Sequence, residues 1–424
     1  MLTMKKILLS CMIFTTPLAA QAAGFALIEQ SGSGMGNAFA GSSAIAEDAS
    51  TIYFNPAGMT YIEGTQLVGA LHLIKPSAEF NNNGSLPGGG PRPLGGSGGD
   101  AGDLAFIPNM YFKTDLNDSI KLGIGINAPF GLKTEYDNGW IGRFQALKSE
   151  VKTVNINPAI AFKLNDQLSL GFGVSAMWAQ ATLTRALNLG AAESDVHIKG
   201  EDWGYGYNLG AIYQATPDTR FGLAYRSKVD QHLQGESKSP FTGLNAVPNR
   251  TPNADVTAAI TLPENFSISA FSRLNETWDV MGDVTWTRWS RFKELKIIRA
   301  NGSLLALTPE NWDDTMRYSI GVNYHYSDSI KLRGGLAYDE EAISDQFRTA
   351  RIPGNDRKWL SLGAGWKVTP SSNVDVGYSH LFISSAKIDD NQTAAIVGPP
   401  GNGRLTGNYD SSVDILSMQY THNF

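Results

Sequence analysis

Residues 278–286 read WDVMGDVTW, and their alternation indicates the fold class. Successive side chains of an extended strand point to opposite faces, so the tryptophans and valines share one face, whereas Asp279 and Asp283 share the other. Trp278 and Trp286 would lie about 26 Å apart along the strand, or roughly 20 Å in height once the strand is tilted by ~40°. This spacing is typical of a membrane-spanning strand with an aromatic residue at each interface.

The same alternation recurs elsewhere in the chain. Phe221, Leu223 and Tyr225 alternate with small or charged residues, and so do the leucines of 332–338. The 424 residues include 45 glycines, 15 tyrosines, 19 phenylalanines and 9 tryptophans. No stretch after residue 23 approaches the roughly 18 apolar residues of a membrane helix. Many aromatic residues and glycines with only 42% hydrophobic residues favour a barrel that is apolar outside and polar inside.

Connections of two lengths separate the predicted strands. Short turns rich in Asn, Asp, Pro and Ser are predicted near 115–118, 164–166, 216–218, 274–276, 327–328 and 369–371. Longer loops are predicted near 81–102, 137–148, 187–196, 231–254, 299–311, 340–356 and 390–408. Short turns at one end and long loops at the other are typical of outer-membrane barrels. We therefore expect an all-β transmembrane barrel of about fourteen antiparallel strands, rather than a soluble propeller, which would not need strands about ten residues long.

Both ends of the chain point to the outer membrane of a Gram-negative bacterium. Residues 1–22 are expected to be a secretory signal peptide, with two lysines before an apolar region and a small-x-small cleavage site at 20–22. A lipoprotein signal ending at Cys11, the only cysteine, is the alternative, but Cys11 lies inside the apolar region. Phe424 ends a strand whose alternate residues are mostly apolar, which resembles the signal that the barrel-assembly machinery recognises.

Residues 24–64 do not alternate, and they precede the first predicted strand. The segment is rich in small residues and glycine and is partly helical in character. A barrel of about fourteen strands has an interior wide enough to need filling, and small residues permit close packing. We therefore expect residues 23–64 to form a luminal hatch with short helices and residues 65–424 to form the barrel. A periplasmic or extracellular position for the first segment is the alternative.

Several short motifs stand out in the predicted hatch, namely Ala23-Gly24-Phe25, Gly32 to Ala38, Ala46 to Ala49 and Asn55-Pro56-Ala57. Further motifs in the predicted barrel are Pro129 to Leu132, Thr134, Tyr136, Trp203-Gly204, Tyr207-Asn208, Tyr225 to Ser227, Asp356-Arg357, Trp359 to Ser361 and Val374 to Gly377. Together these motifs resemble those of the FadL/TodX (OMPP1) family of outer-membrane transporters of long-chain fatty acids and hydrocarbons. The resemblance covers essentially the whole mature chain, and its most specific part is the predicted hatch.

The resemblance implies a fourteen-stranded barrel closed by an N-terminal hatch. A hydrophobic ligand would be caught by outer loops, enter a luminal pocket and leave sideways through an opening made by a kinked third strand. Pro129 and Gly131 interrupt the strand predicted from Ser119 to Tyr136, since proline cannot donate to the strand ladder and glycine often marks a bulge. An ordinary loop that starts at Pro129 is the alternative interpretation.

Arg185 is the residue that the resemblance assigns to a ligand carboxylate. A guanidinium offers a planar fork of donors that suits a carboxylate, and an ordinary salt bridge is the alternative interpretation. The family's second basic residue, a lysine, is not kept, because the aligned stretch is Ala306-Leu307-Thr308-Pro309. This departure leaves room for an uncharged hydrocarbon as the ligand.

Further ligand contacts are expected in the outer loops and at the predicted kink. Phe241 and Leu244 lie where the family has part of its outer ligand groove. Trp140 and Phe144 are apolar for an exposed loop and would form a hydrophobic entrance. Phe130 lies within the motif at the kink. Packing within the loops is the alternative interpretation for the loop residues.

Polar residues of the predicted hatch and lumen have structural interpretations. Asn55 can anchor the hatch by hydrogen bonds and Pro56 fixes the backbone. Together with Ala57 they are assigned to gating or anchoring of the hatch, with a simple turn as the alternative. Arg226 and Arg333 face the lumen by alternation and are expected to be solvated pore charges.

The chain is not expected to be an enzyme. Its six histidines are scattered, and the sequence contains no HExxH, CxxC, Walker A or GxSxG motif. A net charge of −6 provides no basic field for nucleic acid, and neither a cofactor nor a metal is expected. The expected partner is a long-chain fatty acid or another hydrophobic small molecule. A channel for monoaromatic hydrocarbons is the alternative, followed by a general porin or a surface receptor.

Overall fold

The computed structural model describes residues 24–89, 93–190, 192–241, 252–393 and 401–424. The predicted signal peptide and Leu244 lie outside the described residues. The described strands form one closed antiparallel β-barrel of fourteen strands, some of which are divided into two segments. The first and last strands pair with each other along the whole first strand, which closes the cylinder.

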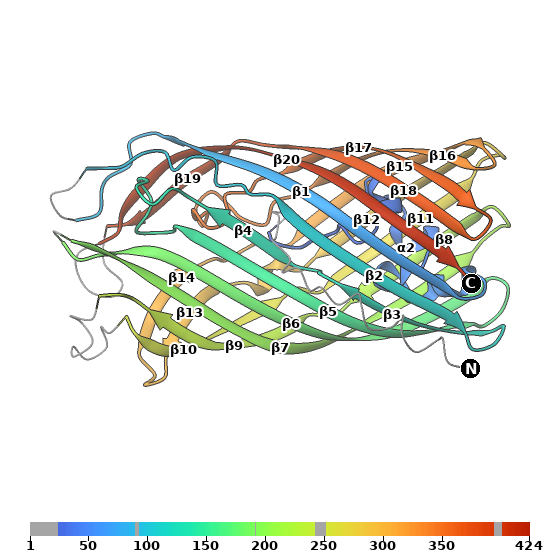
Figure 1. Cartoon of the computed structure of the whole chain (residues 1–424), viewed down its shortest axis with the longest axis horizontal. Coiled ribbons are helices and arrows are strands. Elements are labelled where there is room, and N and C mark those ends of the chain that lie inside the picture. The colour runs from blue at the N-terminus through green and yellow to red at the C-terminus, as the bar shows by residue number, and fades with distance from the viewer. Residues whose placement is uncertain (1–23, 90–92, 191, 242–251, 394–400) are drawn as a thin grey trace, which may run out of the picture.

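Consecutive strands lie next to each other and run antiparallel around the barrel (Figure 1). The undivided strands are β1 (Gln66–Asn82), β2 (Ala105–Asp115), β5 (Lys148–Lys163), β6 (Leu168–Asn188), β7 (Glu193–Gln214), β16 (Ile330–Asp339), β17 (Arg357–Thr369) and β20 (Gly403–Asn423). The divided strands are β3 (Ile120–Asn127) with β4 (Gly131–Glu135), β8 (Thr219–Arg226) with β9 (Val229–Lys238), β10 (Ala254–Leu262) with β11 (Asn265–Arg273), β12 (Trp278–Thr287) with β13 (Glu294–Arg299), β14 (Leu304–Pro309) with β15 (Thr315–Ser327), and β18 (Ser372–Ile383) with β19 (Ala386–Gln392). A short 3₁₀ turn, η2 (Trp289–Arg291), links β12 to β13.

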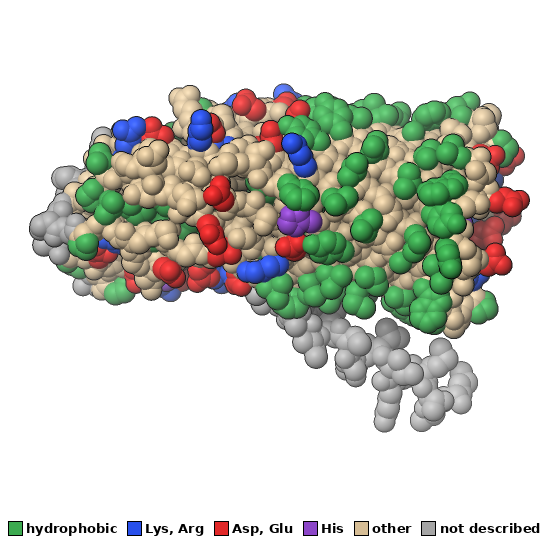
Figure 2. Space-filling view, turned by 90° about the horizontal axis from the view of Figure 1, so that it is seen from above, with side chains coloured by type: hydrophobic (Ala, Val, Ile, Leu, Met, Phe, Trp, Pro, Cys, Tyr) green, Lys and Arg blue, Asp and Glu red, His purple; other side chains and the backbone are tan. Residues whose placement is uncertain are grey.

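The alternation predicted for β12 is confirmed. Trp278 and Val284 are exposed on the outer face, whereas Asp279 and Asp283 are buried toward the lumen. β8 likewise presents Phe221 outward. Figure 2 shows that hydrophobic side chains gather over the half of the barrel that carries the short turns, while charged side chains are spread over the other half. The apolar half is the belt that contacts lipid, and the other half projects beyond the membrane.

The strands continue further beyond the lipid belt than the sequence predicted. β7 has 22 residues. The loops predicted at 187–196 and 299–311 were wrong in large part, because β6 and β7 extend into the first and the β13–β14 hairpin occupies most of the second. Beyond the belt neither face of a strand meets lipid, so the apolar–polar alternation that marks a membrane strand is weaker there.

Residues 24–64, here called the hatch, lie inside the barrel (Figure 1). They contain α1 (Gly32–Met35), α2 (Ser42–Ile45), α3 (Thr51–Phe54) and the 3₁₀ helix η1 (Pro56–Tyr61). α1 contacts β17, β18 and β20, α2 contacts β8 and β11, and η1 contacts β5, β6 and β7. Because these helices contact opposite walls of the barrel, the hatch fills the lumen at the height where the helices lie. Within the described ranges no helix is both long enough and apolar enough to cross a membrane.

Glycines of the wall allow direct backbone contact between the barrel and the hatch. A Cβ atom placed on Gly210 of β7 would lie 1.8 Å from the Oδ1 atom of Asn55. A Cβ atom on Gly171 of β6 would lie 2.2 Å from the backbone nitrogen of Ala57. Real Cβ atoms do not approach other atoms closer than 3.0 Å. Both wall positions therefore require glycine because the hatch occupies the space of a side chain.

Candidate functional site

A cavity of about 730 Å³ lies in the outer half of the barrel, beyond the lipid belt. The outer ends of β6 and β7 and the β13–β14 hairpin form one part of its wall. Residues 346–351 of the β16–β17 loop and residues 389–392 of β19 supply much of the remaining wall. This volume lies within the range of small-molecule binding sites.

Strand alternation gives the cavity an apolar wall. Leu183 and Leu187 line it from β6, and Val196 and Ile198 line it from β7. The hairpin adds Leu295, Ile297, Leu305, Ala306 and Leu307. Transfer of a hydrocarbon chain from water to such a surface is favourable, at about 0.8 kcal/mol for each buried methylene group.

Arg185 lies between the two leucines of β6 and lines the same cavity. Its Nη1 atom donates to the Phe144 carbonyl at 3.3 Å and lies 3.5 Å from the Oδ1 atom of Asn402. No ion pair includes Arg185 in the part of the chain that the structure describes. The guanidinium therefore brings a positive charge to the cavity beside the leucines of β6, without a carboxylate partner among the described residues.

Arg351 is a second cation of the cavity, and the sequence analysis did not single it out. Its Nη2 atom donates to the Gln145 carbonyl at 2.9 Å, and its Nη1 atom donates to the Oγ atom of Ser149 at 2.9 Å. Burial, together with the nearby charge of Arg185, lowers the pKa of Arg351 to about 10, so this loop side chain stays protonated at neutral pH. Arg351 lies far from Arg185 in the sequence, and no motif or spacing joins the two.

The other predicted ligand residues fall into different places. Phe241 lines the cavity, whereas Leu244 lies outside the described residues. Trp140 and Phe144 are absent from the described lining and are buried in a core that ties the 136–147 segment to β1 and β20. Within this core the ring of Trp140 stacks on Tyr136 at 3.9 Å between centroids.

An aromatic cluster connects the cavity with the start of the hatch. The ring of Phe25 packs against Trp289 and Trp312 at centroid distances of 4.9 and 5.7 Å. Phe130, the predicted residue at the kink, lies 6.0 Å from Phe25. Leu295 packs against this cluster and also lines the cavity. The two tryptophans lie in short connections between strand segments, where no periodic pattern marks them.

The third barrel strand is interrupted between β3 and β4. β2 pairs with β1 through nine residues but with β3 through only its last six. The start of the hatch lies along the break: the Leu27 N–H donates to the Pro129 carbonyl and the Gly131 N–H donates to the Phe25 carbonyl, each at 2.8 Å. Within the described ranges β4 pairs with β5 and not with β2. The backbone of the hatch therefore lies where hydrogen bonds between β2 and β4 would otherwise form.

Asn55 ties the hatch to two strands of the wall. Its Nδ2 atom donates to the Ala211 carbonyl of β7 at 3.1 Å and to the Leu223 carbonyl of β8 at 3.3 Å. Its Oδ1 atom accepts the N–H of Ala57 at 3.1 Å, which caps η1. Pro56 is the first residue of that helix, where its missing N–H costs nothing.

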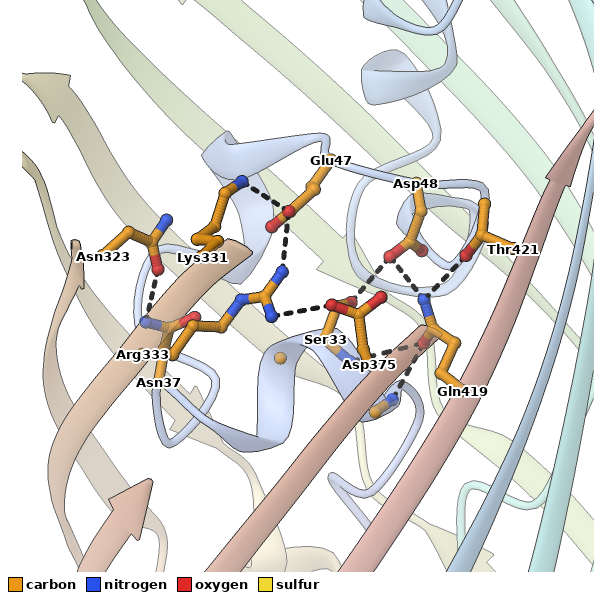
Figure 3. A network of polar contacts seen from close by, with 12 residues as sticks. Ser33, Asn37, Glu47, Asp48, Asn323, Lys331, Arg333, Asp375, Gln419 and Thr421 are labelled. Atoms are coloured by element: carbon orange, nitrogen blue, oxygen red, sulfur yellow. Dashed lines mark hydrogen bonds and ion pairs between the residues drawn. The ribbon is translucent and has the colours of Figure 1, made fainter. Parts of the chain in front are cut away.

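A partly buried ionic network holds the hatch against the barrel, as Figure 3 shows. Glu47 of the hatch pairs with Lys331 at 2.7 Å and with Arg333 at 2.8 Å, both from β16. Arg333 also pairs with Asp375 of β18 at 2.7 Å. One arginine therefore joins a hatch carboxylate to a wall carboxylate.

A second group in Figure 3 joins Asp48 to β20. The Oδ2 atom of Asp48 accepts hydrogen bonds from the Oγ atom of Ser33 at 2.6 Å and from the Nε2 atom of Gln419 at 2.8 Å. The Oε1 atom of Gln419 accepts the N–H of Gly32 at 2.8 Å. Gln419 thus satisfies both a carboxylate of the hatch and the first N–H group of α1.

The luminal arginines Arg226 and Arg333 are buried against the hatch. Arg226 donates to the Tyr53 carbonyl at 2.7 Å, and its guanidinium carbon lies 4.2 Å from the centre of the Tyr53 ring. Arg226 and Arg333 are both buried. The expectation that they are solvated pore charges was wrong, because the hatch fills the lumen beside them and supplies their partners.

The predicted family resemblance is confirmed by comparison with known proteins. Residues 13–424 match the family described as outer membrane protein transport protein (OMPP1/FadL/TodX). The long-chain fatty acid transport protein of Escherichia coli strain K12 is 31% identical over 409 residues, which cover 88% of this chain and 90% of that protein. Outer membrane protein P1 of Haemophilus influenzae strain Rd is 32% identical over 406 residues, which cover 85% of this chain and 86% of that protein.

Solved structures share the fold. A FadL homologue of Pseudomonas aeruginosa matches with a TM-score of 0.87 at 24% identity, covering 95% of this chain and 100% of that chain. The toluene transporter TbuX of Ralstonia pickettii matches with a TM-score of 0.65 at 20% identity, covering 95% of this chain and 99% of that chain. Given a family match along nearly the whole sequence and relatives above 30% identity, this chain is an outer-membrane β-barrel that belongs to the OMPP1/FadL/TodX family of outer membrane transport proteins.

Proposed function

We propose that this protein carries long-chain fatty acids inward across the outer membrane by passive diffusion. The ligand enters the outer cavity, passes the aromatic cluster around Phe25 and leaves sideways between β2 and β4. The observation that carries the proposal is the cavity of about 730 Å³, which combines an apolar wall with the guanidinium of Arg185. An apolar chain with one carboxylate complements both features, because burial of the chain and charge-assisted hydrogen bonds to the carboxylate each favour binding.

The named relatives support a fatty acid over other hydrophobic ligands. The relative of 31% identity from E. coli is a long-chain fatty acid transport protein. The solved toluene transporter is more distant at 20% identity, and its likeness concerns the fold alone.

The proposed route follows residues that contact one another. Leu295 touches both the cavity and the aromatic cluster, and the cluster includes Phe25 and Phe130. Backbone hydrogen bonds hold Phe25 and Leu27 along the break in the third strand. Because this segment fills the break, it must leave before a ligand passes, and the remaining hatch can stay anchored by Asn55. Hydrophobic ligands then reach the lipid without crossing the polar interior of the hatch.

A reversible disulfide tests the route. Ala26 and Phe130 are antiparallel bridge partners flanked by two backbone hydrogen bonds, so they form a pair whose Cα atoms lie about 4.5 Å apart. A disulfide spans that distance. The double variant Ala26→Cys and Phe130→Cys, with Cys11→Ser, should bind a fatty acid in both redox states but transport it into lipid vesicles only when reduced. Equal transport in the oxidised and reduced states would contradict the lateral route.

A channel for monoaromatic hydrocarbons is the second candidate. Ala306, Leu307 and Thr308 make the wall uncharged where the resemblance leads one to expect a lysine. Oleate binding to the detergent-purified protein, with toluene as competitor and Arg185→Ala alongside, separates the candidates. Oleate binding that Arg185→Ala weakens supports the fatty-acid function. Toluene binding without oleate binding moves the protein to the hydrocarbon class, and binding of neither favours a porin or a surface receptor.

A further inference from the structure

We propose that Arg185 and Arg351 together form an anion clamp that makes the cavity select carboxylates over uncharged chains of the same length. The inference rests on the proposed function, because it concerns the head group of the same ligand in the same cavity. Arg185 comes from β6, and Arg351 comes from the β16–β17 loop. The clamp supplies a second cation at a site whose sequence lacks the lysine expected near Thr308.

The two guanidinium groups donate to neighbouring carbonyls of one stretch of backbone, and the charge of Arg185 acts on Arg351. Arg185 donates to the Phe144 carbonyl, and Arg351 donates to the carbonyl of the next residue, Gln145. Adjacent residues lie about 3.8 Å apart along the chain, so both cations belong to the same end of the cavity. The contact of Arg351 with the Oγ atom of Ser149 further fixes its direction. One ligand carboxylate, with two oxygen atoms and about four acceptor positions, can accept from both groups.

Other charges that line the cavity have partners or lie elsewhere. Arg348 pairs with Asp345, and Asp389 pairs with Arg404 at 2.6 Å. Arg299, on β13, donates to the Leu304 carbonyl at 2.6 Å. The Arg348–Asp345 and Asp389–Arg404 ion pairs each cancel their own charges.

The acidic groups near the clamp do not neutralise it. Asp390 lines the cavity and interacts with Arg351, and burial raises the pKa of Asp390 to about 6, so it contributes one negative charge at neutral pH. Burial raises the pKa of Glu310 to about 8, so this nearby carboxyl is mostly protonated at neutral pH. Two arginines therefore face one ionised carboxylate, and a net positive charge is left for a ligand anion.

The energetic consequence is selectivity for the charged head group. Two like charges in a partly desolvated site repel each other, and an anion placed between them relieves that repulsion while accepting charge-assisted hydrogen bonds. A methyl ester or an alcohol with the same hydrocarbon chain buries the same apolar area but leaves the repulsion in place. The apolar wall should therefore contribute equally to both ligands, and the clamp should contribute to the carboxylate alone.

The test compares oleate with its methyl ester on the purified full-length protein in detergent. The variants are Arg351→Gln, Arg351→Lys and, as a control that removes one positive charge from the exposed outer rim, Lys238→Gln. Arg351→Gln should weaken oleate binding at least about ten-fold, equivalent to 1.4 kcal/mol, and should leave methyl oleate binding unchanged. Arg351→Lys should keep most of the oleate affinity, and Lys238→Gln should keep all of it. Thermal unfolding followed by circular dichroism checks that each variant is folded.

Each outcome separates the clamp from the wider function. Equal loss for oleate and methyl oleate in Arg351→Gln, or no loss for either, would overturn the clamp. If the unmodified protein binds the two ligands equally tightly, the clamp is also wrong, whereas the proposed uptake of fatty acids stands. If the unmodified protein binds neither ligand, the proposed function itself fails. Loss of oleate affinity alone, with recovery in Arg351→Lys, would establish the clamp.

Discussion

The substitution Gly210→Ala tests how closely the hatch approaches the barrel wall. The added Cβ atom would lie 1.8 Å from the Oδ1 atom of Asn55, whereas ordinary contact begins near 3.4 Å. Either the hatch must move away from β7 or the Asn55 side chain must rotate. Rotation would break its bonds to the Ala211 and Leu223 carbonyls, and movement of the hatch would separate η1 from the wall.

The expected cost follows from these two losses. Overpacking a filled site costs about 1–3 kcal/mol, and leaving buried hydrogen-bonding groups unpaired costs about 1–3 kcal/mol. A net penalty of about 3 kcal/mol against the docked hatch corresponds to roughly a hundred-fold shift of the docking equilibrium. Asn55→Ala combined with Gly210→Ala should cost little more than either change alone, because both remove the same contact.

A thiol reporter on the hatch measures this shift. Ser50 is buried in the docked hatch, and Ser50→Cys in a Cys11→Ser background should react with a maleimide only after the hatch opens. When reclosing is fast, the labelling rate follows the open population. Gly210→Ala should raise the rate about a hundred-fold, whereas the control Gly282→Ala, whose Cβ atom would meet nothing closer than 3.6 Å, should leave it unchanged. Equal rates in the two variants would refute the close-approach argument.

Three further predictions concern stability. Arg333→Met removes the ion-pair partner of Asp375 and one partner of Glu47, and should lower the free energy of unfolding by about 3–5 kcal/mol. The midpoint of urea unfolding in detergent measures this loss of stability, and an unchanged midpoint would contradict the network. Burial raises the pKa of Glu310 from 4.5 to about 8, so the folded protein holds a proton that the unfolded chain releases, and this group should lower stability as the pH rises from about 4.5 to 8. Melting temperatures at pH 5 and pH 8 should therefore differ less in Glu310→Gln, and an identical pH dependence would argue against the buried carboxyl. Trp140→Ala should cost about 3–5 kcal/mol of stability while oleate affinity is kept, since the ring is buried in a core and is not among the residues that line the cavity. The reverse pattern in calorimetry and binding would make Trp140 a ligand contact.

The charge network in Figure 3 has a further consequence for the hatch. Glu47 and Asp48 are neighbours in the sequence, but they bind different parts of the wall, β16 and β20. Such a two-sided attachment fixes the body of the hatch. The first residues of the hatch, Phe25 to Leu27, are held by backbone hydrogen bonds along the strand break and by ring contacts. Movement limited to this first segment is therefore easier than release of the whole hatch.

The sequence alone determined the features that depend on local periodicity. Alternation in residues 278–286 correctly assigned Trp278 to the outer face and Asp279 to the lumen, because side-chain direction in a strand is a local property of the backbone. Residues 24–64 lack this alternation, and in the structure they contain short helices rather than barrel strands. Local signals failed for strands beyond the lipid belt, where the β13–β14 hairpin was predicted as a loop.

The tertiary structure decided which side chains meet. Arg333 was expected to face water, and the hatch gives it Glu47 as a partner from the opposite end of the sequence. Arg351 carried no motif, yet the closed barrel brings its loop to the same turn of backbone as Arg185. Pairing of this kind depends on which parts of the chain the barrel closure and the loops place together, and strand periodicity contains no information about it. The sequence therefore determined which side chains of a membrane strand point to lipid and which point to the lumen. Only the closed barrel determined which charged side chains meet in the cavity and where the hatch is attached.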